Sequence, residues 1–559
     1  MKPIVLSGLV LGATLSGALN LPMQRVQTRG TSGSTPMSKS SGGSGLKNLE
    51  NNLYAAKFTV GGSSFTLVLD TGSSDLWFAP GKNTAAFANS KIIEPKLTLN
   101  LSYGTGSVVG DVAQLPLLSF AGFDIANQSY LSVTNQDTFF QNFESEQPDF
   151  QGLAGLSFDT LSDINNAVLK ATNDTWGRSL MSNIFLADPS TPNHIAFFLD
   201  RTGDLNDTDT GCFDIGTYAS GYEAVANEQK HEVYSGFNNG VLQWNMLLTG
   251  LKINGKDQKL KSGVKVDKTQ GLTNVPPAGS ISVLFDTGTS AAQIPAESYK
   301  TLYESMGGVL MNGSSLYAVP CLAETAVEFI YGSQSVSIDP LDVTQVNTGT
   351  FGSQNFTYCT SAYEAGEWEG GDNDAILGDA FLRNVYAVYN YGDFVKTESG
   401  FKIGSPFIQF LPLTNATAAS ADFKKARAQA LASLPPEIDV KTINDPHPKP
   451  ASNSSSGSSG STLGSSLDAS NLGSTDSSDD PAAELKSLST LVPIMLGLLG
   501  ACAGLLVILI AVVAAVFARI KKSGVPIQGH AYVPVALERE RVGGYKDEPH
   551  AKYDSQFKD

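Results

Sequence analysis

Short apolar runs bounded by turn-forming residues dominate the chain between about residues 49 and 412. Runs of this length predict strands, whereas a helix needs a longer segment with apolar residues three and four positions apart. Residues 53–60 and 65–69 are two such runs, and the Gly-Gly pair between them predicts a turn. Residues 295–306 differ, because a proline at the start is followed by an apolar stripe at helical spacing. The pattern therefore predicts strands here, with a helix at 295–306.

One alternating stretch, residues 96–103, predicts a hairpin. Its apolar and polar residues alternate strictly, as in a strand with one buried face. Gly104-Thr105-Gly106 supplies the tip, and Val108 begins the return strand. The apolar face carries Leu97, Leu99, Leu101 and Tyr103. A surface hairpin with a buried tyrosine would show the same pattern, so its function depends on the motifs around it.

Two apolar runs end in the same three residues, Asp-Thr-Gly. The copies are Asp70-Thr71-Gly72 and Asp286-Thr287-Gly288, and small hydroxylated residues follow each. One copy would be an ordinary turn, but two copies in separate halves of a folded region predict two matching loops. If the loops meet, their carboxylates hold a single proton, because two like charges that close cannot both ionise. Such a pair offers a general base and a general acid to a water molecule between them.

With these motifs, residues 51–412 resemble the pepsin-family aspartic proteases. Three further motifs occur in the family's order: Tyr103-Gly104-Thr105-Gly106-Ser107, Gly152-Leu153-Ala154-Gly155-Leu156 and Ile376-Leu377-Gly378-Asp379. The resemblance implies an all-β, bilobal fold with a central cleft, residues 49–216 forming the N-terminal lobe and residues 217–412 the C-terminal lobe. It also implies an aspartic-type endopeptidase that hydrolyses peptide bonds in peptide or protein substrates. We expect this activity at acidic pH, with a preference for apolar substrate residues on either side of the peptide bond that is cut.

The resemblance also assigns roles to individual residues, and it implies neither a metal nor a cofactor. Asp70 and Asp286 would activate the water. The loops that carry them would be supported by Thr71, Gly72, Ser73, Thr287, Gly288 and Thr289. The hairpin would become a flap over the substrate, formed by Tyr103, Gly104 and Thr105, with Trp77 bonded to the tyrosine. Cys321 and Cys359 match the family's disulfide in the second lobe, and we interpret Asp379 as structural.

A catalytically silent peptide-binding protein on the same fold is the main alternative. Members of the family that lost activity usually change one Asp-Thr-Gly motif or the flap tyrosine, and both motifs and Tyr103 are intact here. A serine hydrolase or a metallopeptidase is disfavoured, because no Gly-x-Ser-x-Gly or His-Glu-x-x-His motif occurs. Turnover of a peptide substrate distinguishes the protease from the silent binding protein.

The net charge of −17 and the lack of a basic patch before residue 519 argue against nucleic acid as a partner. Two interpretations of the negative charge stay open. It keeps the protein soluble, or it suits an acidic setting in which protonation relieves repulsion. We expect a monomeric protease region whose partners are peptide substrates and a membrane.

The flanks of the protease region differ from it in composition. Residues 1–21 combine a lysine, a short apolar core and small residues at the end, which predicts a signal peptide. Residues 22–48 are polar and rich in Ser and Gly, and they predict a short prosegment or a linker. Residues 413–490 predict a low-complexity stalk, with a short helix at 416–432, because too few apolar residues follow to build a core.

Residues 491–518 carry no charge and are long enough to span a bilayer as a transmembrane helix. Arg519, Lys521 and Lys522 follow directly, which places residues 519–559 in the cytoplasm as a tail. The prediction is a single-pass type I membrane protein of the secretory pathway with lumenal or extracellular lobes. Cell surface, endosome and vacuole all fit. Glycan acceptors of the Asn-x-Ser/Thr type lie at Asn127, Asn173, Asn206, Asn312, Asn355 and Asn415.

Overall fold

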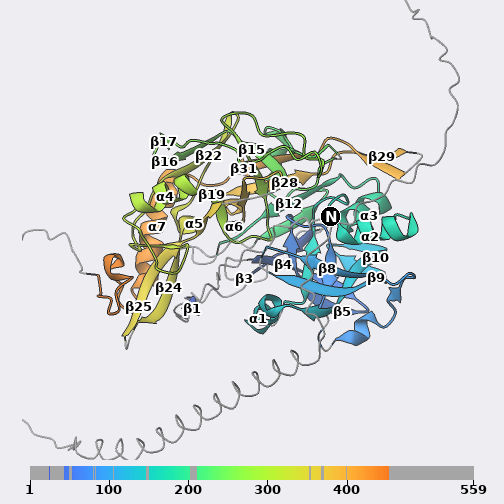
Figure 1. Cartoon of the computed structure of the whole chain (residues 1–559), viewed down its shortest axis with the longest axis horizontal. Helices are drawn as coiled ribbons and strands as arrows, with labels where there is room; N and C mark the ends of the chain where they lie inside the picture. The colour runs from blue at the N-terminus through green and yellow to red at the C-terminus, as the bar shows by residue number, and fades with distance from the viewer. Residues whose placement is uncertain are drawn as a thin grey trace, which may run out of the picture. The chain divides into compact units, whose positions relative to one another are not determined.

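The structure is a computed structural model, and its described residues belong to one compact unit within residues 1–456 (Figure 1). They are residues 24–25, 43–49, 53–79, 81, 83–104, 106–146, 150–201, 211–238, 240–351, 354–366, 371–397 and 400–451. No helix in this part of the chain is long and apolar enough to cross a membrane. The predicted signal peptide, transmembrane helix and cytoplasmic tail lie outside the described residues.

The first half of the protease region builds a nine-stranded sheet around β5, a strand whose last four residues are buried. Leu67, Val68 and Leu69 of β5 are all buried, as expected for a strand covered on both faces. β5 pairs antiparallel with β4 and parallel with β11, and Gly155 of β11 lies opposite Asp70. The sheet runs β3 (Lys47–Leu49), β4 (Leu53–Val60), β5 (Ser63–Asp70), β11 (Gly152–Gly155), β6 (Leu76–Phe78), β10 (Phe123–Gln136), β9 (Ser107–Phe120) and β7 (Lys91–Ile92), with β8 (Thr98–Ser102) paired to β9.

The second half repeats this arrangement around β18 (Ile281–Phe285). β18 pairs parallel with β27 (Ala375–Leu377), as β5 pairs with β11, and all five of its residues are buried. The sheet runs β15 (Asn245–Leu248), β18, β27, β19 (Ala292–Pro295) and β26 (Tyr363–Gly366). Two further sheets follow it. One runs β17 (Lys256–Asp257), β16 (Gly250–Ile253), β22 (Val327–Tyr331) and β23 (Gln334–Ser337), and the other runs β1 (Gln24–Arg25), β24 (Thr344–Phe351), β25 (Gln354–Ser361), β21 (Tyr317–Val319) and β20 (Val309–Leu310).

A six-stranded sheet contains strands from both halves of the chain. It runs β14 (His231–Glu232), β31 (Phe407–Pro412), β28 (Val385–Asn390), β12 (His194–Phe198), β13 (Cys212–Ile215) and β2 (Gly43–Gly45). β12 from the first half pairs antiparallel with β28 from the second. Backbone hydrogen bonds therefore join the two halves directly. A separate hairpin consists of β29 (Phe394–Thr397) and β30 (Gly400–Ile403).

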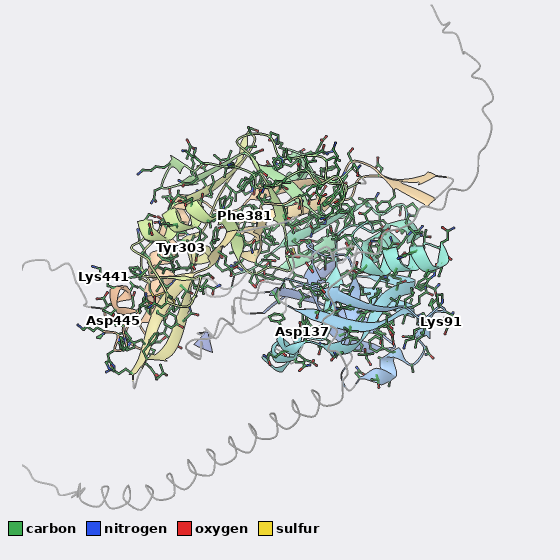
Figure 2. The ribbon with its side chains drawn as sticks, in the orientation of Figure 1. Lys91, Asp137, Tyr303, Phe381, Lys441 and Asp445 are labelled. Atoms are coloured by element: carbon green, nitrogen blue, oxygen red, sulfur yellow. A yellow bond between two sulfur atoms is a disulfide. The ribbon has the colours of Figure 1, made fainter. Side chains whose placement is uncertain are left out.

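Helices are few and short, so the fold is mostly β. The predicted helix at 295–306 is observed as α4 (Ala296–Ser305), and it buries Tyr299, Leu302 and Tyr303. Figure 2 shows Tyr303 within the second half of the molecule. The other helices are α1 (Thr138–Glu146), α2 (Asp163–Thr172), α3 (Leu180–Ala187), α5 (Pro340–Val343), α6 (Asp379–Leu382) and α7 (Ala416–Leu431), with 3-10 turns η1 (Thr84–Phe87), η2 (Glu223–Asn227) and η3 (Val440–Thr442).

Two segments that flank the predicted lobes contain folded structure. The predicted prosegment or linker, residues 22–48, includes β2 and most of β3, which pair with β13 and β4. The predicted stalk, residues 413–490, begins with a folded part, residues 413–451. The chain folds there because α7 carries a buried stripe: Ala419, Phe423, Ala426 and Arg427 lie three and four positions apart. The predicted helix at 416–432 is observed as α7, so the folded region continues past the predicted end of the second lobe.

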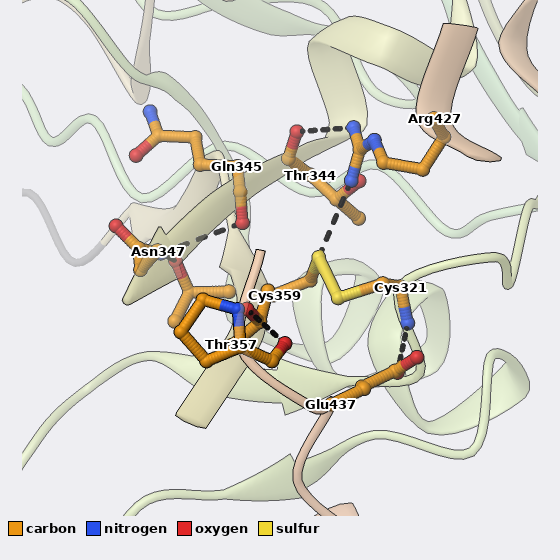
Figure 3. The surroundings of a disulfide bond; sticks show 10 residues. Cys321, Thr344, Gln345, Asn347, Thr357, Cys359, Arg427 and Glu437 are labelled. Atoms are coloured by element: carbon orange, nitrogen blue, oxygen red, sulfur yellow. Dashed lines mark hydrogen bonds between the residues drawn. A yellow bond between two sulfur atoms is a disulfide. The ribbon is translucent and has the colours of Figure 1, made fainter. Parts of the chain in front are cut away.

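This folded C-terminal segment, residues 413–451, packs around the disulfide between Cys321 and Cys359 (Figure 3). Arg427 of α7 donates to the Cys359 Sγ at 3.4 Å and to the Thr344 carbonyl at 3.1 Å. Glu437 accepts from the Cys321 backbone N–H at 2.7 Å. Burial lowers the pKa of Arg427 to about 10. The segment is thus an integral part of the second half.

A stability measurement tests this assignment of residues 413–451. Phe423 is fully buried, so we expect Phe423→Ala to lower the free energy of unfolding by about 3–5 kcal/mol. Lys425 lies exposed on the same helix, and Lys425→Ala should change it by less than about 0.5 kcal/mol. Denaturant unfolding of both variants measures the difference. Equal stability of the two would mean that α7 is not part of the cooperative unit.

Candidate active site

The two Asp-Thr-Gly loops lie together in the structure, although they are far apart in the chain. Asp70 ends β5, and Asp286 directly follows β18. Both carboxyl groups have no exposed surface. Each loop leaves a strand that is buried on both faces, which fixes the position of its aspartate at the centre of the molecule.

The threonines of the two motifs lock the loops to each other. The Thr71 Oγ1 accepts from the Thr287 N–H at 3.0 Å and donates to the Phe285 carbonyl at 2.8 Å. The Thr287 Oγ1 accepts from the Thr71 N–H at 3.1 Å and donates to the Leu69 carbonyl at 2.7 Å. Each hydroxyl therefore satisfies one donor and one acceptor of the opposite loop. Side-chain-to-backbone bonds are formed in both directions across a separation of 216 residues.

Each carboxyl group is also held by its own loop, in the same way on both sides. The Gly72 N–H donates to Asp70 Oδ1, and the Gly288 N–H donates to Asp286 Oδ1, both at 2.8 Å. Ser73 Oγ donates to the other oxygen of Asp70, and Thr289 Oγ1 to that of Asp286. These bonds fix the orientation of each carboxyl group within its own loop.

The glycines of the motifs are required by the close approach of the opposite aspartate. A Cβ on Gly72 would lie 2.6 Å from the carboxyl atoms of Asp286. A Cβ on Gly288 would lie 2.4 Å from Asp70 Oδ1. A larger residue at either position would clash with the opposite carboxyl group, so each loop lies directly against the aspartate of the other.

Burial and proximity shift the titration of the pair. Burial raises the pKa of Asp286 well above its usual range, and the neighbouring Asp70 charge raises it further. Burial also raises the pKa of Asp70, while bonds from Ser73 and from Asp286 oppose the shift. The pair therefore keeps one proton at a pH where two ordinary aspartates would be ionised.

Tyr103 and Trp77 form the expected contact at the hairpin. The Trp77 Nε1–H donates to the Tyr103 hydroxyl at 2.7 Å, and both side chains are buried. The Tyr103 N–H donates to the Gly106 carbonyl at 2.7 Å and closes the hairpin. A Cβ on Gly104 would meet no atom within 4 Å, so the tip is open there. Thr105 lies outside the described residues.

Some residues of the site carry no local signal in the sequence. Gln243 donates from Nε2 to the Gly72 carbonyl at 2.8 Å, and Trp244 donates from Nε1 to the Leu156 carbonyl at 3.1 Å. Both come from the segment that enters β15 in the second half, yet they bond loops of the first. A Leu-Gln-Trp sequence has no distinctive spacing, so these contacts follow from the fold alone.

Asp379 adds a third buried carboxyl group near the pair. Neither of its oxygens has a hydrogen-bond partner among the described residues. Burial raises its pKa well above the usual range, Arg383 opposes the shift, and the Asp286 charge adds to it. Its backbone N–H donates to the Thr289 carbonyl at 2.8 Å, which ties the start of α6 to the second loop. Across the described ranges, no three His, Cys, Asp or Glu side chains are placed to hold a metal ion.

The family model for eukaryotic aspartyl proteases matches residues 53–396, more than half of the chain. The chain belongs to this family. Similar proteins include Major aspartyl peptidase 1 of Cryptococcus neoformans var. grubii, 24% identical over 60% of this chain and 66% of its own length. Endothiapepsin of Cryphonectria parasitica is 26% identical over 60% of this chain and 72% of its own, and ctsD of Aspergillus fumigatus is 28% identical over 60% and 63%. This aspartyl protease family member thus spans about two thirds of the length of the first of these relatives.

The threonine lock, the four bonds that Thr71 and Thr287 form between the two loops, can be tested by an isosteric change. Thr71→Val leaves the Thr287 N–H and the Phe285 carbonyl buried without partners, so we expect a loss of about 2–4 kcal/mol in unfolding free energy. Thr344→Val is the matched control, because the buried Thr344 hydroxyl has no partner in the part of the chain that the structure describes. That variant should be neutral or slightly more stable. Equal effects in denaturant unfolding would contradict the role of the lock.

The raised pKa of Asp286 makes stability depend on pH. Folding favours its protonated form, so its contribution is present below the ordinary value of about 4 and is lost as pH rises through the raised value. We expect the unfolding free energy of the wild type to fall from pH ~4 to pH ~7, and that of Asp286→Asn to fall less. Denaturant unfolding across this range measures both. Parallel curves would show that this carboxyl group does not titrate abnormally.

Proposed function

We propose that residues 49–412 are an aspartic-type endopeptidase whose catalytic residues are Asp70 and Asp286. The observation that carries the proposal is the buried carboxyl pair, held together by two loops that bond each other. The family of the chain supports the reaction class, and the shared proton supports its chemistry. The intact Tyr103–Trp77 contact supports a flap that covers the substrate.

In the proposed reaction, the ionised Asp70 takes a proton from a water molecule between the carboxyl groups. The water oxygen attacks the peptide carbonyl carbon while the protonated Asp286 gives its proton to the carbonyl oxygen. The resulting tetrahedral diol is neutral. Asp70 then passes its proton to the amide nitrogen, the C–N bond breaks, and Asp286 regains a proton from one diol hydroxyl. Both carboxyl groups return to their starting states, so no covalent intermediate forms.

The substrate proposed for this site is an extended segment of peptide or protein with apolar residues beside the cut. An acidic medium suits the chemistry, because the pair must keep one proton. The threonine lock and the glycines hold the carboxyl groups in place before substrate arrives, so little reorganisation is needed at the moment of reaction.

We also propose that the protease is a type I membrane protein of the secretory pathway. Residues 491–518 supply an uncharged span, and Arg519, Lys521 and Lys522 follow it. The disulfide of Cys321 and Cys359 fits an oxidising compartment. The stalk would then start after residue 451, and a signal peptide at residues 1–21 would direct the lobes to the lumen or cell exterior.

Substitution of either aspartate tests the catalytic proposal. Asp70→Asn and Asp286→Asn should each lower the rate of hydrolysis of a denatured protein at acid pH by on the order of 1,000-fold, because either the base or the acid is lost. Asp257→Asn, an exposed position, should keep the wild-type rate. A statine-type peptide should inhibit the wild type at saturation. Wild-type rates in either active-site variant would refute the assignment, and peptide binding without turnover in the wild type would favour a silent binding protein.

A further inference from the structure

The carboxylate of Asp137 touches the flap hairpin directly. Asp137 lies between β10 and α1, and Figure 2 labels it beside that helix. Its Oδ2 accepts from the Ser107 N–H at 2.5 Å, and its own N–H donates to the Ser107 carbonyl at 3.1 Å. Ser107 is the first residue of β9 and directly follows the flap tip. The two residues therefore extend the β9–β10 ladder, whose last pair is Gln136 and Val108, by one step toward the tip.

The same carboxylate also caps helix α1. Asp137 Oδ1 accepts from the Phe140 N–H at 3.2 Å, and the Asp137 carbonyl accepts from the Gln141 N–H at 3.1 Å. An aspartate before the first turn suits a helix, because it satisfies a free N–H and the positive end of the dipole. One side chain thus joins the start of the helix to the flap, with one oxygen serving each.

The flap tip is shaped to admit this carboxylate. A Cβ on Gly106 would lie 2.9 Å from both Asp137 oxygens and 3.0 Å from the Phe139 ring. Any larger residue at Gly106 would push the hairpin off the first turn of α1. The glycine therefore allows the tip to rest against Asp137.

Phe140 of the same helical turn supports the other arm of the hairpin. Its ring meets that of Tyr103 edge to face at 5.7 Å and that of Trp77 edge to face at 5.5 Å. The start of α1 consequently contacts the outgoing arm through Phe140 and the return arm through Asp137.

We propose that Asp137 is a positioning residue that fixes the flap before substrate binds. The proposal rests on the protease function proposed above. Without the carboxylate, the flap samples more positions, and its ordering opposes substrate binding. The carboxyl pair is held by separate bonds, so the chemical step proceeds unchanged once the substrate is bound. Loss of Asp137 therefore raises KM and leaves kcat nearly constant.

Two variants remove the contacts of the Asp137 carboxylate in steps. The side chain of the Asp137→Asn variant has one acceptor oxygen, so it can accept a hydrogen bond from the Phe140 N–H or from the Ser107 N–H but not from both. The Asp137→Ala variant can accept neither bond. The control is Asp439→Ala, which removes a similar cap from η3 in the C-terminal segment. Hydrogen exchange of the flap amides in substrate-free protein measures how well the contact holds the flap. Kinetics with a peptide substrate measure the effect of its loss on KM and kcat.

We expect flap exchange to be about tenfold faster and KM about tenfold higher in Asp137→Ala, with a smaller change in Asp137→Asn and kcat within about twofold of the wild type. Asp439→Ala should leave flap exchange and KM unchanged. Unchanged flap exchange in both Asp137 variants would overturn the proposal. So would faster exchange with unchanged KM, or a rise in exchange that is equal throughout the protein. The exchange measurement needs no activity, so faster flap exchange in a protein without peptidase turnover would refute the protease function and leave the flap contact standing.

Discussion

Two carboxyl groups of like charge are buried side by side at the centre of this molecule, and this constraint explains much of the structure around them. Burying one ionised carboxylate is costly, and burying two in contact is more so, which is why the pair retains a proton. The surrounding structure must therefore hold the two buried groups close enough to share that proton. It does so with bonds that cross between the loops, because the Thr71 and Thr287 hydroxyls bond the backbone of the opposite loop.

The same constraint explains the similarity of the two halves. Each aspartate needs a strand that ends at the centre, a glycine that leaves room for the opposite side chain, and a second strand beneath. β5 with β11 and β18 with β27 meet these needs in the same parallel pairing. β12 and β28 from the two halves also pair in one sheet, so backbone hydrogen bonds outside the two loops join the halves. The pair is fixed by the backbone as well as by side chains.

Away from the carboxyl pair, short helices and the C-terminal segment stabilise the edges of the sheets. Arg427 and Glu437 of the C-terminal segment bond the backbone and sulfur around the disulfide, and the family match ends before them, at residue 396. Ile438 and Val440 of this segment belong to a buried apolar cluster that covers one face of the β24–β25 hairpin. On the first half, α1 has a comparable local role, since its first turn contacts both arms of the flap hairpin. Short helices thus fix the loops and edges that the sheets leave unsupported.

The sequence alone determined the strands that lead to Asp70 and Asp286, the helix predicted at 295–306 and the hairpin that turns at Gly104 and Gly106, because these depend on local periodicity and on glycine. It also indicated the family, through motifs that keep their order along the chain. Only the tertiary structure decided which distant groups meet. The bonds of Gln243 to Gly72, of Asp137 to Ser107 and of Arg427 to the disulfide join segments 171, 30 and 68 residues apart. A local sequence pattern does not predict these contacts, because any polar residue of suitable length would be acceptable at each position. The packing of whole sheets determines which partner each residue meets.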